Sequence, residues 1–152
     1  MKKILAVLLC FALTFGLLAC GGKNLSEYGS QFVGTYKHNG TIMEKFKSYG
    51  NSNVNLIDVT EILTLEGGGT GTFKMTVASA GEHYKVGDVV KEGTVRWMID
   101  GDYITVTFSG FSYTKDYGQN TTNIVDSVAT YEKKAGTLHD ASSGTLRYTK
   151  IG

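Results

Sequence analysis

The side chains that most often perform catalysis are few and scattered in this chain. His38, His83 and His139 form no His-x-His or His-x₃-His pair, so their spacing does not predict a metal site. Asp100 and Asp102 flank a glycine, where turn formation accounts for both carboxylates. No Gly-x-Ser-x-Gly segment marks a serine nucleophile. The sequence therefore predicts no catalytic residue, no metal and no cofactor, and we expect the protein not to be an enzyme.

A glycine run, Gly67-Gly68-Gly69-Thr70-Gly71, is the one segment that could cradle a phosphate. It matches neither the dinucleotide-binding nor the Walker pattern, and no helix is expected after it. A tight turn between two strands is the better interpretation.

The chain begins with a segment typical of exported proteins. Lys2 and Lys3 precede Ile4–Leu18, an almost wholly apolar stretch. This arrangement predicts a signal peptide over Met1–Ala19. An uncleaved anchor helix is the alternative, but a spanning helix needs about 20 apolar residues and this stretch is shorter.

Leu17-Leu18-Ala19-Cys20 resembles the lipobox of bacterial lipoproteins. The resemblance implies cleavage before Cys20 and attachment of fatty-acyl groups, such as palmitate, through the Cys20 sulfur. Two or more chains give stable membrane attachment, because one holds only marginally. The resemblance places the protein on the cell membrane or the outer membrane, with an extracytoplasmic domain.

The processed chain would carry almost no net charge and no thiol. Cys10 leaves with the leader and Cys20 carries the lipid, so no disulfide can form. Loss of Lys2 and Lys3 reduces 15 basic residues to 13, against 14 acidic residues. This balance argues against nucleic acid as a partner.

The remaining sequence is typical of an antiparallel β protein. It is rich in Gly, with 20 residues, and has no Pro. Apolar and polar residues alternate with a period of two, as in Val95, Trp97 and Ile99. We expect eight strands: Phe32–His38, Thr60–Glu66, Thr70–Val77, Val89–Ile99, Asp102–Ser109, Asp126–Lys133, Ala135–His139 and Gly144–Thr149.

The connections predict how the strands are arranged. Long loops are expected over Asn39–Val59, Ala78–Asp88 and Gly110–Val125, and tight turns in the alternate connections. In up-and-down order, all long loops fall at one end of the sheet. The sequence thus predicts a signal peptide over 1–19, a lipidated tether over 20–31, and an eight-stranded antiparallel up-and-down barrel over 32–152.

The barrel resembles lipocalin-like domains of bacterial lipoproteins. Gly34-Thr35-Tyr36 is similar to the Gly-X-Trp of lipocalins, and Arg147 is similar to the basic residue that packs over that aromatic. The resemblance implies that Tyr36 and Arg147 close the barrel, and that the interior binds a small apolar or amphiphilic ligand.

Aromatic residues in the expected loops are candidates for ligand contact. Phe46 and Tyr49 fall in the first loop, Tyr84 in the second, and Phe111 and Tyr113 in the third. These residues either bind a ligand or plug the loop end, because both roles use the same side chains. The single tryptophan, Trp97, is expected in the core, with ligand stacking as the second interpretation.

Two functions are consistent with these features. The first is a non-enzymatic module that binds a small ligand at the loop end. The alternative is a protein-interaction module, such as an inhibitor or an accessory subunit of the cell envelope, with an envelope protein as its partner.

Overall fold

The computed structural model describes residues 29–134 and 136–152. The leader, Cys20 and most of the expected tether lie outside the described residues. A 3₁₀ turn, η1, and eight strands make up the described part: η1 (Ser30–Phe32), β1 (Gly34–Ser48), β2 (Asn51–Leu65), β3 (Thr70–Val77), β4 (Val89–Asp100), β5 (Tyr103–Asp116), β6 (Gln119–Lys134), β7 (Thr137–Asp140) and β8 (Leu146–Lys150). Among these elements there is no helix long and apolar enough to span a membrane.

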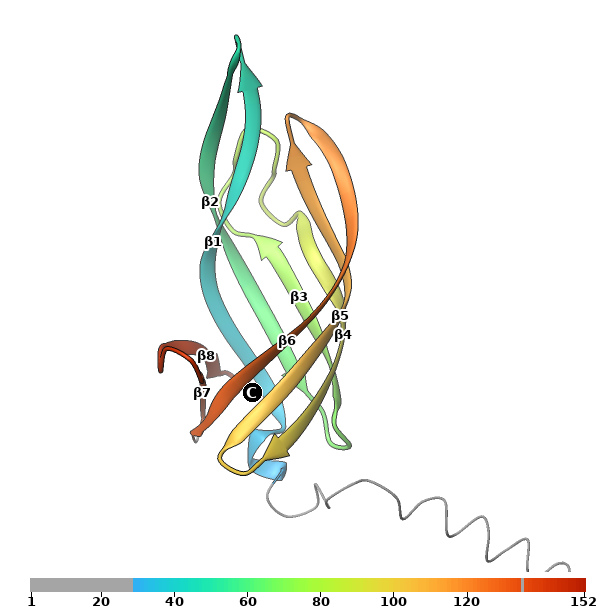
Figure 1. The fold of residues 1–152 in the computed structure, drawn as a ribbon, viewed down its shortest axis with the longest axis vertical. Coiled ribbons are helices and arrows are strands. Elements are labelled where there is room, and N and C mark those ends of the chain that lie inside the picture. Colours follow the sequence, from blue (N-terminus) through green and yellow to red (C-terminus); the bar gives the residue numbers. More distant parts are fainter. Residues whose placement is uncertain (1–28, 135) are drawn as a thin grey trace, which may run out of the picture.

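The strands form one closed antiparallel barrel in sequential order, β1 to β8, with β8 returning to β1 (Figure 1). The predicted fold class is therefore confirmed. Each predicted tight turn is also present: β2 ends at Leu65 before β3, β4 ends at Asp100 before β5, and β6 ends at Lys134 before β7. The alternation of buried and exposed residues is clear on β3, whose Phe73 faces the core and whose Lys74 faces solvent.

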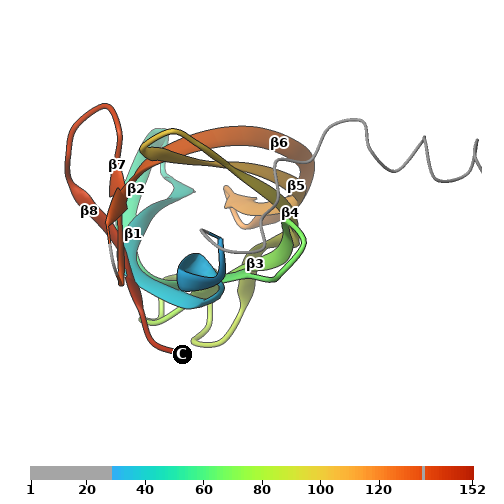
Figure 2. The ribbon, with the colours of Figure 1, turned by 90° about the horizontal axis from the view of Figure 1, so that it is seen from below.

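The 3₁₀ turn η1 closes the lower end of the barrel, as the view from below shows (Figure 2). Phe32, predicted as the first residue of a strand, belongs instead to η1, and its side chain is buried. The Tyr36 hydroxyl donates a hydrogen bond to the Phe32 carbonyl at 2.8 Å. The buried Tyr36 hydroxyl thus has a hydrogen-bond partner. This bond holds η1 in place across the end of the barrel.

Two of the three expected long loops are wrong. Residues 39–59 continue β1 and β2 into a long hairpin, and residues 110–125 do the same for β5 and β6. Both hairpins turn on a Tyr-Gly pair, Tyr49-Gly50 and Tyr117-Gly118, in which all four residues have positive φ. Two consecutive residues of positive φ match the twist of a two-residue hairpin. Residues 78–88 do form a loop, as predicted, and it lies at the same end as the two hairpins (Figure 1).

The buried apolar residues form two clusters, one above the other. The lower cluster contains most of the large side chains, including Tyr36, Trp97 and Tyr148. The upper cluster is smaller and consists of Ile57, Val59, Val77, Tyr84 and Val90. Met75 packs against both clusters. Both draw their buried residues from Phe32–Tyr148.

The strands that close the barrel are much shorter than their neighbours. β7 and β8 have 4 and 5 residues, whereas β1 has 15 and β6 has 16. Among the described residues, β1 is paired on this side only near its start and near its end. Thr35, Tyr36 and Lys37 bond to β8 or to the residues that follow it, and Lys45 pairs with β5. Above the β7–β8 hairpin, β1 residues 38–44 and β6 residues 119–129 therefore face each other across the barrel wall with no strand paired between them. We call this gap in the wall the side opening.

Candidate functional site

A cavity of about 350 Å³ lies inside the barrel behind the side opening. Its volume falls in the range of small-molecule sites, about 300–1,000 Å³. Its wall combines aromatic and apolar side chains with a few charged ones: Glu61, Phe73, Met75, Lys91, Phe108, Ser127, Ala129, Tyr131, Asp140, Arg147 and Tyr148.

The alternation of β6 shows that the cavity is open to solvent. Ser127 lies opposite the inward-facing Phe108, and it lines the cavity, yet it is exposed. Its neighbour Val128 points outward and is 66% exposed. A residue that faces the interior and is still exposed requires that solvent reach the interior. The side opening gives that access.

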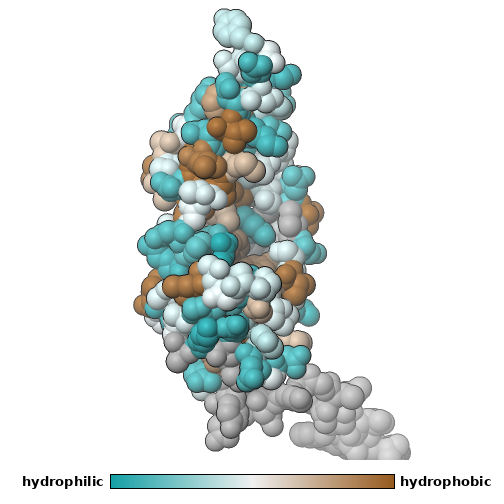
Figure 3. Space-filling view, turned by 60° about the vertical axis from the view of Figure 1, so that its left-hand side comes forward, coloured by the Kyte–Doolittle hydropathy of each residue, from teal (hydrophilic) through white to brown (hydrophobic). Residues whose placement is uncertain are grey.

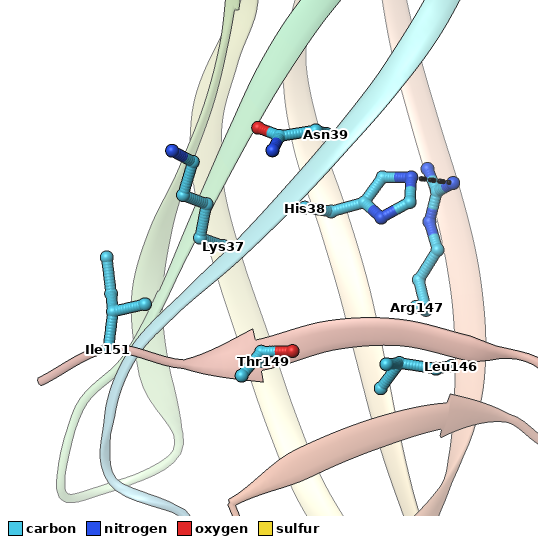
Figure 4. Close-up of a pocket in the computed structure, with 7 residues that line it drawn as sticks. All are labelled: Lys37, His38, Asn39, Leu146, Arg147, Thr149 and Ile151. Atoms are coloured by element: carbon cyan, nitrogen blue, oxygen red, sulfur yellow. Dashed lines mark hydrogen bonds between the residues drawn. The ribbon is translucent and has the colours of Figure 1, made fainter.

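A charged network closes the cavity below. Arg147 on β8 donates two hydrogen bonds to the carboxylate of Glu61 on β2, at 2.8 and 3.0 Å. Arg147 also contacts Nε2 of His38 on β1 at 2.9 Å, and the two side chains point toward each other (Figure 4). The Tyr148 hydroxyl donates to Glu61 at 2.6 Å. Because Glu61 is only 3% exposed, these bonds are what make its burial tolerable.

The surroundings fix the protonation states in this network. Burial, followed by the Arg147 charge, lowers the pKa of His38, so its Nε2 is an acceptor for Arg147 at neutral pH. Burial and the Glu61 carboxylate raise the pKa of Tyr148. Burial raises the pKa of Tyr131 to about 12. Both tyrosines therefore remain neutral and can donate hydrogen bonds.

Loop 78–88 closes the barrel above the cavity. The Glu44 carboxylate on β1 accepts hydrogen bonds from three successive backbone N–H groups of the loop, at Glu82, His83 and Tyr84. On the other side, the Tyr84 hydroxyl donates to the Tyr113 carbonyl and accepts from the Lys115 N–H, each at 3.0 Å. The loop is thus bonded to β1 and to β5, and it covers the upper cluster.

The predicted aromatic residues do not meet around one pocket. Tyr84 is buried in the upper cluster, where it plugs the barrel. Phe46 packs edge-on against His83, with ring centroids 6.0 Å apart. Tyr49 lies fully exposed at the tip of the β1–β2 hairpin, and Tyr113 is 39% exposed on β5. None of these four side chains lines the cavity.

Trp97 lies in the lower cluster, in agreement with the first of its two predicted roles. Its Nε1 donates to the Glu66 and Thr70 carbonyls, both at 3.0 Å. Phe111 lies on β5, opposite Glu92 and Ile124, and its side chain is outside the described part of the chain.

Tyr36 and Arg147, implied as a closing pair, have different partners. The Arg147 guanidinium is bonded to Glu61 and His38 and lies 5.6 Å from the ring centroid of Tyr148. Tyr36 is bonded to Phe32 and is fully buried below. Arg147 still closes the barrel, but it does so across β8, β1 and β2 through the Glu61 network.

Three charged residues of the interior, Glu44, Glu61 and Lys91, were not predicted from the sequence. A signal was present for two of them. Glu61 is in phase with Leu63 and Leu65 on β2, and Lys91 is in phase with Val95 on β4. A charge at an apolar phase predicts either a buried network or a binding site.

Other features contribute less to the site. In residues 29–134 and 136–152, no group of three or more His, Cys, Asp or Glu side chains is placed to hold a metal ion. A second depression, of about 370 Å³, lies where β1 meets β8 and shares His38 and Arg147 with the network (Figure 4).

Comparison of this chain with protein-family models, with curated proteins and with solved structures gave no match. Its function is therefore inferred from the cavity and the residues around it.

Replacement of Glu44 tests how the loop is held. Burial raises the pKa of the Glu44 carboxyl, but the three backbone donors, of which His83 contributes most, outweigh burial and leave the pKa lowered. A lowered folded pKa gives stability that is complete above the unfolded pKa and is lost as pH falls through the folded pKa. We expect Glu44→Gln to lower the free energy of unfolding by about 2 kcal/mol at pH 7.

Urea denaturation at several pH values measures this effect. The difference from wild type should shrink as the pH falls through the lowered pKa of the Glu44 carboxyl, where the wild-type side chain becomes protonated. Glu82→Gln is the control, because it removes the same charge from an exposed position of the same loop. Equal stability of the two variants at pH 7 would show that Glu44 does not hold the loop.

Proposed function

We propose that this protein is a lipid-anchored, extracytoplasmic barrel that binds a small ligand in the cavity behind its side opening. The observation that carries the proposal is the solvent-accessible cavity of about 350 Å³ with Phe73, Met75 and Phe108 on its wall. Apolar walls with a few convergent polar groups are typical of small-molecule sites. The ligand would enter through the wall of the barrel, since loop 78–88 covers the end.

The proposal assigns no reaction to the cavity. Glu61 is the most buried carboxylate on its wall, and both of its oxygens are bonded, to Arg147 and to Tyr148. A carboxylate held in this way is neutralised by its partners. The Tyr148 hydroxyl that is bonded to it is buried and has a raised pKa, so it is not activated as a nucleophile. Binding without catalysis is the role that suits this arrangement.

The membrane attachment is proposed from the Leu17–Cys20 motif and the position of the barrel ends. Gly29 is the first described residue and lies at the lower end, next to η1 (Figure 1). A lipid on Cys20 would therefore hold the lower end near the membrane. The two hairpins and loop 78–88 would point away from it.

Adjacent positions on β6 give a matched test of ligand binding. Ser127 faces the cavity, and Val128 faces solvent on the outer wall. We expect Ser127→Trp to fill the cavity and weaken binding of the neutral apolar dye N-phenyl-1-naphthylamine by about tenfold or more, measured by fluorescence titration. Val128→Trp should bind as wild type does. If the wild type did not bind the dye, or if the two variants bound it equally, the proposal that the cavity binds a small ligand would be contradicted.

Lipid attachment is tested by metabolic labelling with a palmitate analogue. The wild-type chain should incorporate the label, and Cys20→Ser should not, because the acyl groups are attached through the Cys20 sulfur. Cys10→Ser is the control, since Cys10 lies within the leader. Labelling that survives Cys20→Ser would contradict the proposed anchor.

A protein-interaction role is the second proposal, and the free edge of β1 favours it. Between His38 and Glu44, β1 has no strand partner on the side of the opening among the described residues. Beside this edge, three exposed apolar side chains, Met43, Val54 and Leu56, gather on the outer face of the β1–β2 hairpin (Figure 3). An extended segment of an envelope protein could pair with such an edge.

Photo-crosslinking separates this second role from the first. A photoreactive residue at Met43 should form a discrete adduct with one envelope protein. The same residue at Met98, an equally exposed position on β4, should not. Identical adduct patterns at the two positions would exclude a specific interface at the β1 edge.

A further inference from the structure

Lys91 is the charged residue of the cavity that has no charged partner among the described residues. It lies on β4, opposite Met75 of β3 and Ser112 of β5, and it lines the cavity. Its ammonium lies 5.6 Å from the ring centroids of both Phe73 and Phe108. Within the described part of the chain, it forms no ion pair and no hydrogen bond.

The two rings hold the ammonium in place but do not neutralise it. Phe73 and Phe108 pack edge to face, with centroids 5.2 Å apart, so they form a rigid support under the lysine. A cation–π contact attracts a positive charge and leaves that charge in place. Lys91 is half-buried, and no carboxylate of the described residues pairs with its charge, so an anion in the cavity could do so.

The other charges of the cavity are already accounted for. Nη2 of Arg147 donates to both carboxylate oxygens of Glu61, so the two charges neutralise each other. Asp140 accepts hydrogen bonds from the backbone N–H groups of Ser142 and Ser143, at 2.9 and 3.0 Å, so it stabilises the turn after β7. Lys91 is left as the cation that a bound molecule could neutralise.

We propose that the ligand is an anionic amphiphile whose carboxylate, or similar anionic group, pairs with the Lys91 ammonium. Its apolar part lies against Phe73, Met75, Phe108 and Ala129. This inference rests on the proposed function of the cavity and adds the charge of the ligand to it. A charge-assisted hydrogen bond to Lys91 gives the anion its preference over a neutral molecule of the same shape.

Calorimetric titration of residues 20–152 carrying Cys20→Ser tests this proposal, because the barrel core lies wholly within that range. The probes are decanoate, decanol and decyltrimethylammonium, which share an alkyl chain and differ in charge. We expect decanoate to bind about tenfold more tightly than decanol. In Lys91→Met this preference should disappear, so that decanoate and decanol bind equally, and Lys91→Arg should retain it.

Lys74→Met is the matched control. Lys74 lies on β3 at an exposed position, paired with Glu92 at 3.7 Å, so its loss removes a similar charge without touching the cavity. Decanoate binding by Lys74→Met should equal that of wild type. Circular dichroism and thermal unfolding would confirm that the lysine variants are folded.

The outcomes separate this inference from the function on which it rests. If the wild type bound decanoate and decanol equally, or bound the cationic probe most tightly, the proposal that the ligand is anionic would be wrong. The proposal that the cavity binds a small ligand would still stand. An anion preference that survives in Lys91→Met would exclude Lys91 as its source. Failure of all three probes, together with failure of the neutral dye, would remove the cavity function itself.

Discussion

The inequality in strand length around the barrel determines most of what is unusual in this structure. β1 and β6 have 15 and 16 residues, and the two strands between them have 5 and 4. Backbone pairing can therefore close the wall only in its lower part and at the contact of Lys45 with β5. Between these points the interior meets solvent, so an apolar filling cannot be continuous there. The core divides into two clusters, and the cavity lies at the level where the wall is incomplete.

Each boundary of the cavity is stabilised by a buried carboxylate. Glu44 above is bonded to three backbone N–H groups of loop 78–88, and Glu61 below is bonded to Arg147 and Tyr148. A buried carboxylate is costly unless its oxygens are bonded, and here every oxygen has a partner. Such bonds are directional, so they fix one position of loop 78–88 and one position of β8. Apolar contacts alone would leave the positions of these two segments less well defined where the wall is open.

The sequence predicted the eight strands, their order and the barrel from alternating apolar and polar residues, which on β3 correspond to alternating buried and exposed side chains. It failed where burial ends. Residues 51–56 are all exposed, so alternation disappears although the strand continues. Backbone pairing runs to the Tyr49-Gly50 and Tyr117-Gly118 turns and continues these strands beyond the buried core. The candidate site was missed for a related reason. The aromatic residues assigned to loops lie on strands, at a hairpin tip or in the plug of the barrel end. The cavity depends on strand lengths that no local pattern encodes.

Charge at inward positions offers the most direct connection between this sequence and a function. Glu44, Glu61 and Lys91 all interrupt apolar faces. Two of them are explained by the structure, since each completes a network that holds the barrel together. Lys91 differs, because only aromatic rings contact its ammonium within the described part of the chain. A methionine would cover the same rings without the cost of partly desolvating a charge. Packing therefore does not account for a lysine at this position, whereas an anionic ligand in the cavity would supply the partner that the fold does not.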